Sequence, residues 1–109
     1  MISLTEEDFS STVAEGNWIV DFYAPWCGPC KTIAKSLENL ESKYPDVKFG
    51  KCDVDSCTKI AEEFHIRSVP IVSVFKNGKQ VSTLVGAVPA SAIEGILTAH
   101  ENLCRTMQS

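Results

Sequence analysis

Two cysteines separated by two residues are the part of this sequence best suited to chemistry. Cys27 and Cys30 follow an apolar segment and stand where a segment of helical periodicity begins. At a helix start, residues three apart have Cα atoms about 5.5 Å apart, within the range that a disulfide bond needs. We therefore expect the pair to switch between dithiol and disulfide with little backbone movement, as thiol–disulfide exchange requires.

The position of the pair on the helix predicts different roles for its two members. Cys27 stands at the N-terminus, where unpaired backbone amides and the positive end of the helix dipole stabilise a thiolate. Cys30 continues the apolar stripe of Ile33 and Leu37, so its side chain is expected to point inward. We therefore predict an exposed nucleophile at Cys27 and, at Cys30, a buried thiol that resolves the mixed disulfide.

Two other interpretations of the pair stay open at this point. Cys27 and Cys30 could bind zinc together with Cys52 and Cys57, although four residues rather than two separate the second pair. The pair could also be a purely structural disulfide. Because the cysteine total of five is odd, a fully cross-linked secreted domain is disfavoured.

Helix and strand signals alternate around this pair. Apolar runs covered on both sides predict central strands, and Asn77-Gly78 between two strand signals predicts a hairpin. We expect an α/β fold in one domain over residues 1–109, with a central mixed β-sheet flanked by helices on both faces. The predicted strands are 18–24, 47–54, 71–76 and 79–85; the predicted helices are one that Thr5 caps and Gly16 ends, 29–44, a short one capped by Asp55 or Ser56, and 89–103.

The composition and the first residues of the chain argue against some classes of partner and indicate a cellular compartment. The 109 residues carry a formal net charge of −4, which argues against a nucleic-acid phosphate backbone as a partner. No apolar run reaches the roughly 18 residues of a membrane span. The first residues lack the basic start and long apolar stretch of a secretory signal, so we expect a cytoplasmic protein without membrane partners.

The chain resembles the thioredoxin family over about positions 2 to 103. The cysteine pair lies in that family's signature, and the later landmarks of the family follow in the same order. The matching segments are Val20-Asp21-Phe22-Tyr23-Ala24-Pro25, Trp26-Cys27-Gly28-Pro29-Cys30, Val69-Pro70, Phe75-Lys76-Asn77-Gly78 and Val85-Gly86-Ala87. The resemblance implies a thioredoxin fold and a dithiol–disulfide oxidoreductase.

Two charged residues gain candidate roles from this resemblance. Asp21 lies within an apolar strand, where burial is expected to raise the pKa of its carboxyl group. The resemblance implies that Asp21 accepts the proton of Cys30 and that the ammonium group of Lys51 lies near it. The alternatives are an Asp21 satisfied by local hydrogen bonds and a Lys51 at the surface with only its stem packed.

The resemblance also implies a surface for an extended substrate peptide. A cis peptide bond before Pro70 would place that residue beside the cysteines and leave the backbone of Val69 free to pair with the substrate. Trp26, Gly86 and Ala87 would complete this surface, although Trp26 could instead serve in packing. Ile71 stands where many members carry Thr, and we expect it to make the surface more apolar.

The resemblance implies a general protein-disulfide reductase that contributes to cell redox homeostasis. Gly28 and Pro29 between the cysteines are similar to the reducing branch of the family and would tune the redox pair, whereas the oxidising branch carries a histidine there. The chain would bind no cofactor and no metal, and would receive electrons from NADPH through a separate thioredoxin reductase. Its oxidised protein substrates would include peroxiredoxins, and we expect a monomer. A binding module that releases its partner on oxidation is the alternative.

The other three cysteines have no part in this interpretation. Cys52 is expected to be a small buried apolar residue in a strand. Cys57 lies on the apolar stripe of its helix, and Cys104 lies near the end of the last one. Regulatory oxidation of Cys57 or Cys104 is a further hypothesis.

Overall fold

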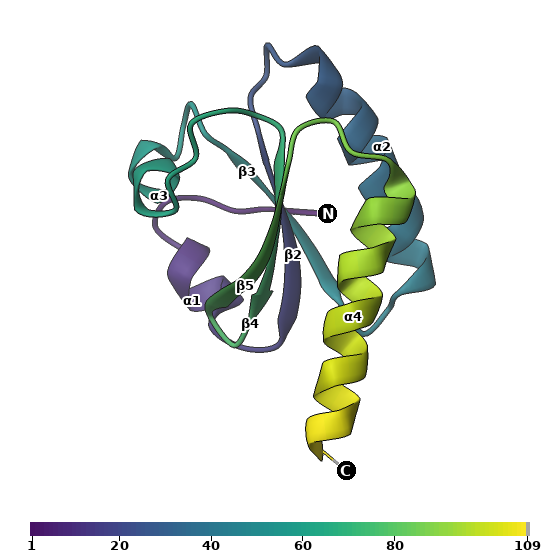
Figure 1. Ribbon diagram of the computed structural model, residues 1–109. Helices are drawn as coiled ribbons and strands as arrows, with labels where there is room; N and C mark the ends of the chain where they lie inside the picture. Colours follow the sequence, from purple (N-terminus) through teal and green to yellow (C-terminus); the bar gives the residue numbers. More distant parts are fainter. Residues whose placement is uncertain (109) are drawn as a thin grey trace.

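The computed structural model describes residues 1–108, with side chains described for residues 1–99. Strands and helices alternate through most of this length (Figure 1). In chain order the elements are β1 (Ile2–Ser3), α1 (Phe9–Val13), β2 (Asn17–Tyr23), α2 (Gly28–Lys43), β3 (Lys48–Asp53), α3 (Thr58–Glu63), β4 (Ile71–Lys76), β5 (Lys79–Val85) and α4 (Ala90–Gln108).

The strands form one mixed sheet in the order β1-β3-β2-β4-β5. The three strands β1, β3 and β2 run parallel, whereas β4 is antiparallel to both β2 and β5. Helices α1 and α3 cover one face of the sheet, and α2 and α4 cover the other (Figure 1). The predicted α/β architecture, a mixed sheet with helices on both faces, is confirmed.

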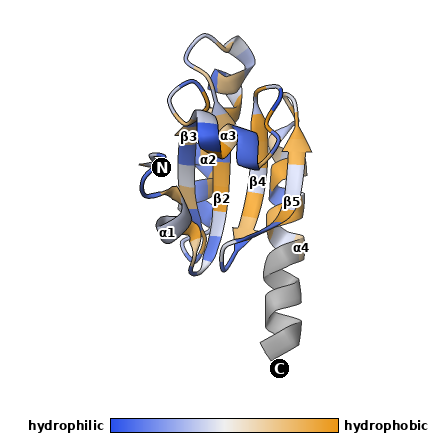
Figure 2. Ribbon diagram, turned by 90° about the vertical axis from the view of Figure 1, so that its left-hand side faces the viewer, coloured by the Kyte–Doolittle hydropathy of each residue, from blue (hydrophilic) through white to orange (hydrophobic). Residues whose placement is uncertain are grey.

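Strand β2 lies at the centre of the sheet and carries side chains into both layers of the core. Trp18, Val20 and Phe22 belong to the apolar cluster on the α1 and α3 side, and Ile19 belongs to the cluster on the α2 and α4 side. Figure 2 shows β2 and β4 as predominantly hydrophobic ribbons. Each such large side chain, fully buried, contributes about 1.5–3 kcal/mol. This packing fixes the strand that leads directly into the cysteine pair.

Near the N-terminus, the structure differs from the prediction in two ways. Strand β1 was not predicted, because its two residues are too few to show a period; it pairs with Gly50 and Lys51. Thr5 does form a capping arrangement, since its backbone N–H donates to Asp8 Oδ1 at 2.8 Å and its hydroxyl accepts from the Asp8 N–H at 3.3 Å. The regular helix nevertheless begins only at Phe9, one turn later.

The predicted cap of the third helix is wrong. Helix α3 begins at Thr58, and the turn before it is held by Asp53, whose carboxylate accepts from the Asp55 N–H and the Ser56 hydroxyl. The backbone N–H of Lys59 donates to the Glu6 carboxylate instead. The side chain of Asp55 is thereby free for a contact described below.

Helix α4 extends beyond the predicted end at residue 103, to Gln108. It packs on the sheet through Ile93 and Leu97, and Glu94 accepts a hydrogen bond from the Tyr44 hydroxyl at 2.8 Å. Cys104 lies outside the residues whose side chains are described. Within the described chain, no helix combines the length and the apolar character needed to cross a membrane.

A pair of glycine substitutions tests the packing between β1, β2 and β3. A Cβ at Gly50 would lie 2.9 Å from Leu4 Cδ1 and 3.3 Å from Trp18 Cζ3, whereas a Cβ at Gly95 of α4 meets nothing within 4 Å. We expect Gly50→Ala to lower the free energy of unfolding by about 1–3 kcal/mol through overpacking. The control Gly95→Ala should raise it by about 0.5–1 kcal/mol, because alanine favours a helix. Urea unfolding measures both, and a Gly50→Ala protein as stable as the parent would contradict this packing.

Candidate redox site

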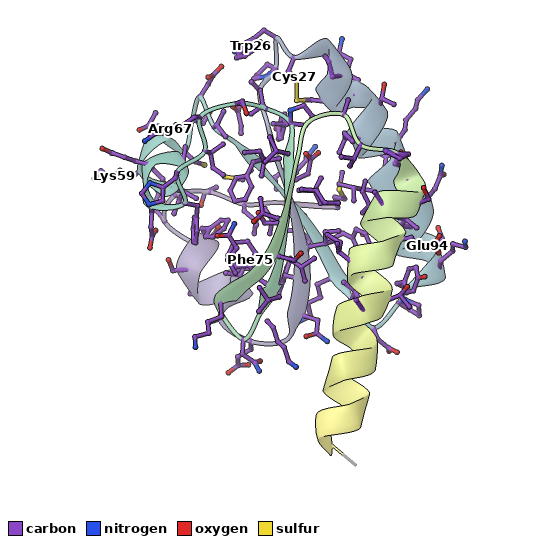
Figure 3. All side chains as sticks on the ribbon, viewed as in Figure 1. Trp26, Cys27, Lys59, Arg67, Phe75 and Glu94 are labelled. Atoms are coloured by element: carbon purple, nitrogen blue, oxygen red, sulfur yellow. A yellow bond between two sulfur atoms is a disulfide. The ribbon has the colours of Figure 1, made fainter. Side chains whose placement is uncertain are left out.

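The cysteine pair lies at the N-terminus of α2 and forms a disulfide bond (Figure 3). Cys27 is the N-cap residue, with φ −86° and ψ 110°, and Pro29 lies in the first turn. The Cα atoms of Cys27 and Cys30 are 5.4 Å apart, as the spacing predicted. The backbone N–H of Cys30 donates to Cys27 Sγ at 3.2 Å, so a helix amide points at this sulfur.

The exposure predicted for Cys27 is wrong for the disulfide form. The two residues are equally buried, at 4% exposed for Cys27 and 3% for Cys30. They pack with Ala24, and Tyr23, Val54 and Val69 lie against this small cluster. The bonded sulfurs are covered by these neighbours, whereas Gly28 and Pro29 of the first turn are exposed. Helix position, rather than exposure, therefore distinguishes the two sulfurs.

Asp21 is a buried carboxyl group without full hydrogen bonding. Its residue is 1% exposed, and within the described chain its Oδ1 has no hydrogen-bond partner. Burial raises the pKa of Asp21 to about 7, and the positive charge of Lys51 opposes that rise only in part. The two residues are register partners on β2 and β3. The alternative of an Asp21 satisfied by local hydrogen bonds is therefore wrong for this oxygen.

A cavity connects this carboxyl group with the cysteines. It has a volume of about 210 Å³, and Asp21, Lys51, Cys27, Cys30 and Lys31 are among the residues that line it. A single water molecule occupies about 30 Å³ of liquid, so the cavity has room for several. Four residues predicted for the site therefore line one cavity. Lys31 lines it as well and is a charged residue that was not predicted.

The loop before β4 lies against the disulfide. The peptide bond between Val69 and Pro70 is cis, as the resemblance implied, and Val69 packs on the cluster of the two cysteines. Within the described chain, neither backbone N–H nor C=O of Val69 has a hydrogen-bond partner. The Gly86 N–H donates to the Pro70 carbonyl at 2.9 Å, which brings Gly86 and the exposed Ala87 to the same end of the sheet.

Trp26 lies at the surface next to Cys27 (Figure 3). It is 72% exposed, so the alternative that it serves in packing is wrong. Its Nε1 donates to Asp55 Oδ2 at 2.9 Å, and a shallow cavity of about 100 Å³ lies between Trp26, Arg67 and Val69. The Asp55 contact joins residues 29 apart, and no sequence pattern indicated it.

Ile71 does not enlarge this surface, contrary to the prediction. It is 5% exposed and belongs to the core cluster that contains Phe22 and Phe75. As the first residue of β4, it points into the sheet's core rather than toward the cysteines. The substitution of the family's usual threonine therefore changes the core.

The structure also separates the cysteines that a zinc site would have needed together. Cys52 and Cys57 lie in the core cluster on the α1 and α3 side, whereas Cys27 and Cys30 form their own cluster. In the described residues, no group of three or more His, Cys, Asp or Glu side chains could hold a metal ion.

Comparisons with known proteins agree with this geometry. The sequence profile of the Thioredoxin family matches residues 1–99. Thioredoxin-1 of Saccharomyces cerevisiae is 42% identical over 93 residues, which cover 84% of this chain and 90% of that protein. The crystal structure of oxidised mitochondrial thioredoxin 3 from the same yeast superposes with a TM-score of 0.81 at 36% identity, covering 90% of this chain and 94% of that one.

A further solved structure concerns the thiol-resolving mechanism of a yeast mitochondrial 1-Cys peroxiredoxin through the glutathione and thioredoxin systems. A chain in it matches with a TM-score of 0.81 at 35% identity, covering 90% of this chain and 94% of that chain. Thioredoxins bind no cofactor and are reduced by thioredoxin reductase. The chain belongs to the thioredoxin family and is a thiol–disulfide oxidoreductase, a protein-disulfide reductase of the thioredoxin type with a Cys-x-x-Cys redox pair.

Proposed function

We propose that Cys27 is the nucleophile and Cys30 the resolving thiol in the reduction of protein disulfides. The observation that carries this assignment is the position of Cys27 as N-cap of α2, with the Cys30 amide directed at its sulfur. Amides and the helix dipole favour a thiolate at this position. Cys30 lies one turn into the helix, on the face that it shares with Ile33 and Leu37, and is therefore assigned the resolving step.

The reaction then proceeds in two exchanges. The Cys27 thiolate attacks one sulfur of the substrate disulfide, forms a mixed disulfide and releases the other substrate sulfur as a thiolate. Cys30 loses its proton and attacks Cys27 Sγ, which releases the second substrate thiolate. Two electrons have passed to the substrate, and the chain is left with the disulfide between Cys27 and Cys30.

Asp21 is our candidate for the group that accepts the Cys30 proton. A carboxylate with a pKa of about 7 takes up and returns protons near neutral pH. Asp21 and Cys30 line the same cavity, which has room for the water that would carry the proton between them. Lys51 lines this cavity too, and its charge keeps part of the Asp21 population ionised and ready to accept.

The substrate peptide is proposed to bind across the surface around the disulfide. The unpaired backbone groups of Val69 are suited to pair with an extended peptide by strand addition. Trp26 offers an exposed aromatic face beside Cys27, and Gly86, whose N–H donates to the Pro70 carbonyl, is proposed to complete the surface together with Ala87. Aromatic side chains held in this way are frequent anchors of binding surfaces.

The electron source and the targets follow from this role. The sequence contains no G-x-G-x-x-G fingerprint for a dinucleotide, so we propose that NADPH acts through a separate thioredoxin reductase. Peroxiredoxins are proposed among the substrates, since one similar structure concerns a peroxiredoxin served by the thioredoxin system. We also propose that the chain is a monomer in the cytoplasm, whereas one of the similar structures is a mitochondrial thioredoxin.

Serine variants of the two cysteines should fail at different steps. Cys27→Ser should lower insulin reduction at least about a thousandfold, because the nucleophile is lost. Cys30→Ser should also stop turnover, but it should accumulate a mixed disulfide between Cys27 and the substrate that non-reducing electrophoresis detects. The opposite pattern would reverse the assignment, and binding of partners that survives in both variants would favour a binding module.

The raised pKa of Asp21 makes stability depend on pH. The folded chain holds this proton up to about pH 7 and the unfolded chain only up to about 3.8, so stability falls as the pH rises between these values. Since each pKa unit corresponds to about 1.4 kcal/mol, Asp21→Asn should be more stable than the parent by about 4 kcal/mol at pH 8. At pH 4 the two proteins should differ little.

Urea unfolding at pH 4, 6 and 8 measures this dependence. Asp46→Asn, which removes an exposed carboxylate, is the matched control and should change stability equally little at each pH. Asp21→Asn should also slow turnover, most of all where deprotonation of Cys30 limits the rate. A pH-independent stability difference would contradict the raised pKa, and unchanged kinetics would remove Asp21 from the mechanism.

A further inference from the structure

Two more cysteines lie buried outside the site described above. Cys52, in the middle of β3, is 0% exposed, and Cys57, directly before α3, is 3% exposed. Both are free thiols, and both belong to the core cluster on the α1 and α3 side of the sheet. The mechanism proposed for the disulfide of α2 uses neither of them.

A tight turn brings these two thiols together. After Cys52 the chain reverses at Asp53, whose carbonyl accepts from the Cys57 N–H at 2.8 Å and whose carboxylate accepts from the Asp55 N–H at 2.9 Å. The Cys57 thiol is close enough to contribute to the raised pKa of Cys52, after the larger effect of burial. The two thiols therefore lie at the two ends of a short loop and in one buried cluster, without a bond between them, and the Cys57 thiol donates to the Leu4 carbonyl at 3.7 Å.

A small oxidant has a route to one of the two sulfurs. Cys57 lines a cavity of about 340 Å³ together with Glu6, Lys51 and Asp53. Hydrogen peroxide is only slightly larger than water, which needs about 30 Å³. The side chains of Lys51, Glu6 and Asp53 make the lining of this cavity polar, so water and a small polar oxidant can enter it.

We propose that Cys52 and Cys57 are a second redox pair, which a hydroperoxide closes into a disulfide. The Cys57 sulfur attacks the peroxide oxygen, breaks the O–O bond and becomes a sulfenic acid, releasing one water. The Cys52 sulfur then attacks the Cys57 sulfur and releases a second water. The two thiols are oxidised by two electrons, and the peroxide is reduced to two molecules of water.

The pair of Cys52 and Cys57 is expected to be oxidised at higher peroxide concentrations than the pair of Cys27 and Cys30 on α2. Burial and the neighbouring carboxylates hold the Cys52 thiol in its protonated form, and the protonated thiol is a poor nucleophile. The Cys27 sulfur, in contrast, lies at a helix N-terminus with an amide directed at it. The second pair therefore closes only when peroxide exceeds what the first pair consumes.

A disulfide between Cys52 and Cys57 would affect the redox site through the turn that separates these two cysteines. Val54 packs against both the core cluster and the cluster of Cys27 and Cys30, and Asp55 accepts the hydrogen bond of Trp26. A bond between Cys52 and Cys57 tightens this turn and so displaces the support of Trp26. This consequence rests on the proposed function, whereas formation of the disulfide does not.

Digestion with trypsin gives a direct test for the disulfide between Cys52 and Cys57. Cleavage after Lys51 and Lys59 yields a peptide, Cys52–Lys59, which contains both thiols and no other cysteine. The reduced protein is treated with increasing hydrogen peroxide, alkylated after denaturation and digested. We expect this peptide to appear two hydrogen atoms lighter and unalkylated, at peroxide doses above those that close Cys27 and Cys30, and to revert with dithiothreitol. The control Cys104→Ser should behave like the parent, and Cys57→Ala should form no such bond.

Two results would overturn the pair. One is full alkylation of the Cys52–Lys59 peptide at every dose that leaves the protein folded, and the other is a sulfinic acid at Cys57 with Cys52 alkylated.

Insulin reduction coupled to thioredoxin reductase tests the consequence separately. The initial rate should fall by about twofold or more after peroxide in the parent, but not in Cys57→Ala. Closure without this fall would refute the effect on Trp26, and an inactive untreated parent would instead refute the proposed function.

Discussion

The contact on which the rest of the site depends is the one between the first amides of α2 and the sulfur of Cys27. The N–H of Cys30 reaches this sulfur at 3.2 Å, and only a helix that begins at this residue makes that possible. Hydrogen bonds to charged groups contribute about 1.5–3 kcal/mol, and a helix terminus adds about 0.3–1 kcal/mol. A few kcal/mol is enough to change the thiolate population by orders of magnitude. The central strand β2, packed on both faces, holds the start of this helix in place.

The buried carboxyl group of Asp21 is the feature of this site that lowers the stability of the fold. A carboxylate at 1% exposure with an unpaired oxygen destabilises the fold at neutral pH, and Lys51 relieves this only in part. The same feature gives the site a carboxyl group with a pKa of about 7, which we propose as the proton acceptor. Asp21 thus lowers the stability of the fold at a position where we propose that it accepts a proton, a pattern typical of active sites. The large core clusters on both faces of the sheet make this loss tolerable.

Much of the fold and of the central site could be predicted from local patterns in the sequence. Apolar runs and the Asn77-Gly78 turn located four of the strands closely, the helical period located α2 and the start of α4, and the cysteine spacing located the disulfide. The features that were missed depend on tertiary contacts. Asp55 was predicted as a helix cap, yet it binds Trp26, 29 residues away. Ile71 was expected at the surface, but the register of β4 turns it into the core. The burial of Cys27 depends on Val69 and Val54, which come from other loops.

The reactivity of Cys27 is the central claim, and competitive alkylation tests it most directly. The fully reduced protein is exposed to limiting iodoacetamide at pH 6, beside N-acetylcysteine as a reference thiol, and the Met1–Lys31 peptide is then mapped. The helix amides should make Cys27 react at least about fivefold faster than the reference, because more of it is thiolate at this pH. If Cys27 reacted no faster than N-acetylcysteine, or if Cys30 were alkylated first, the start of α2 would not activate this sulfur and the account would be wrong.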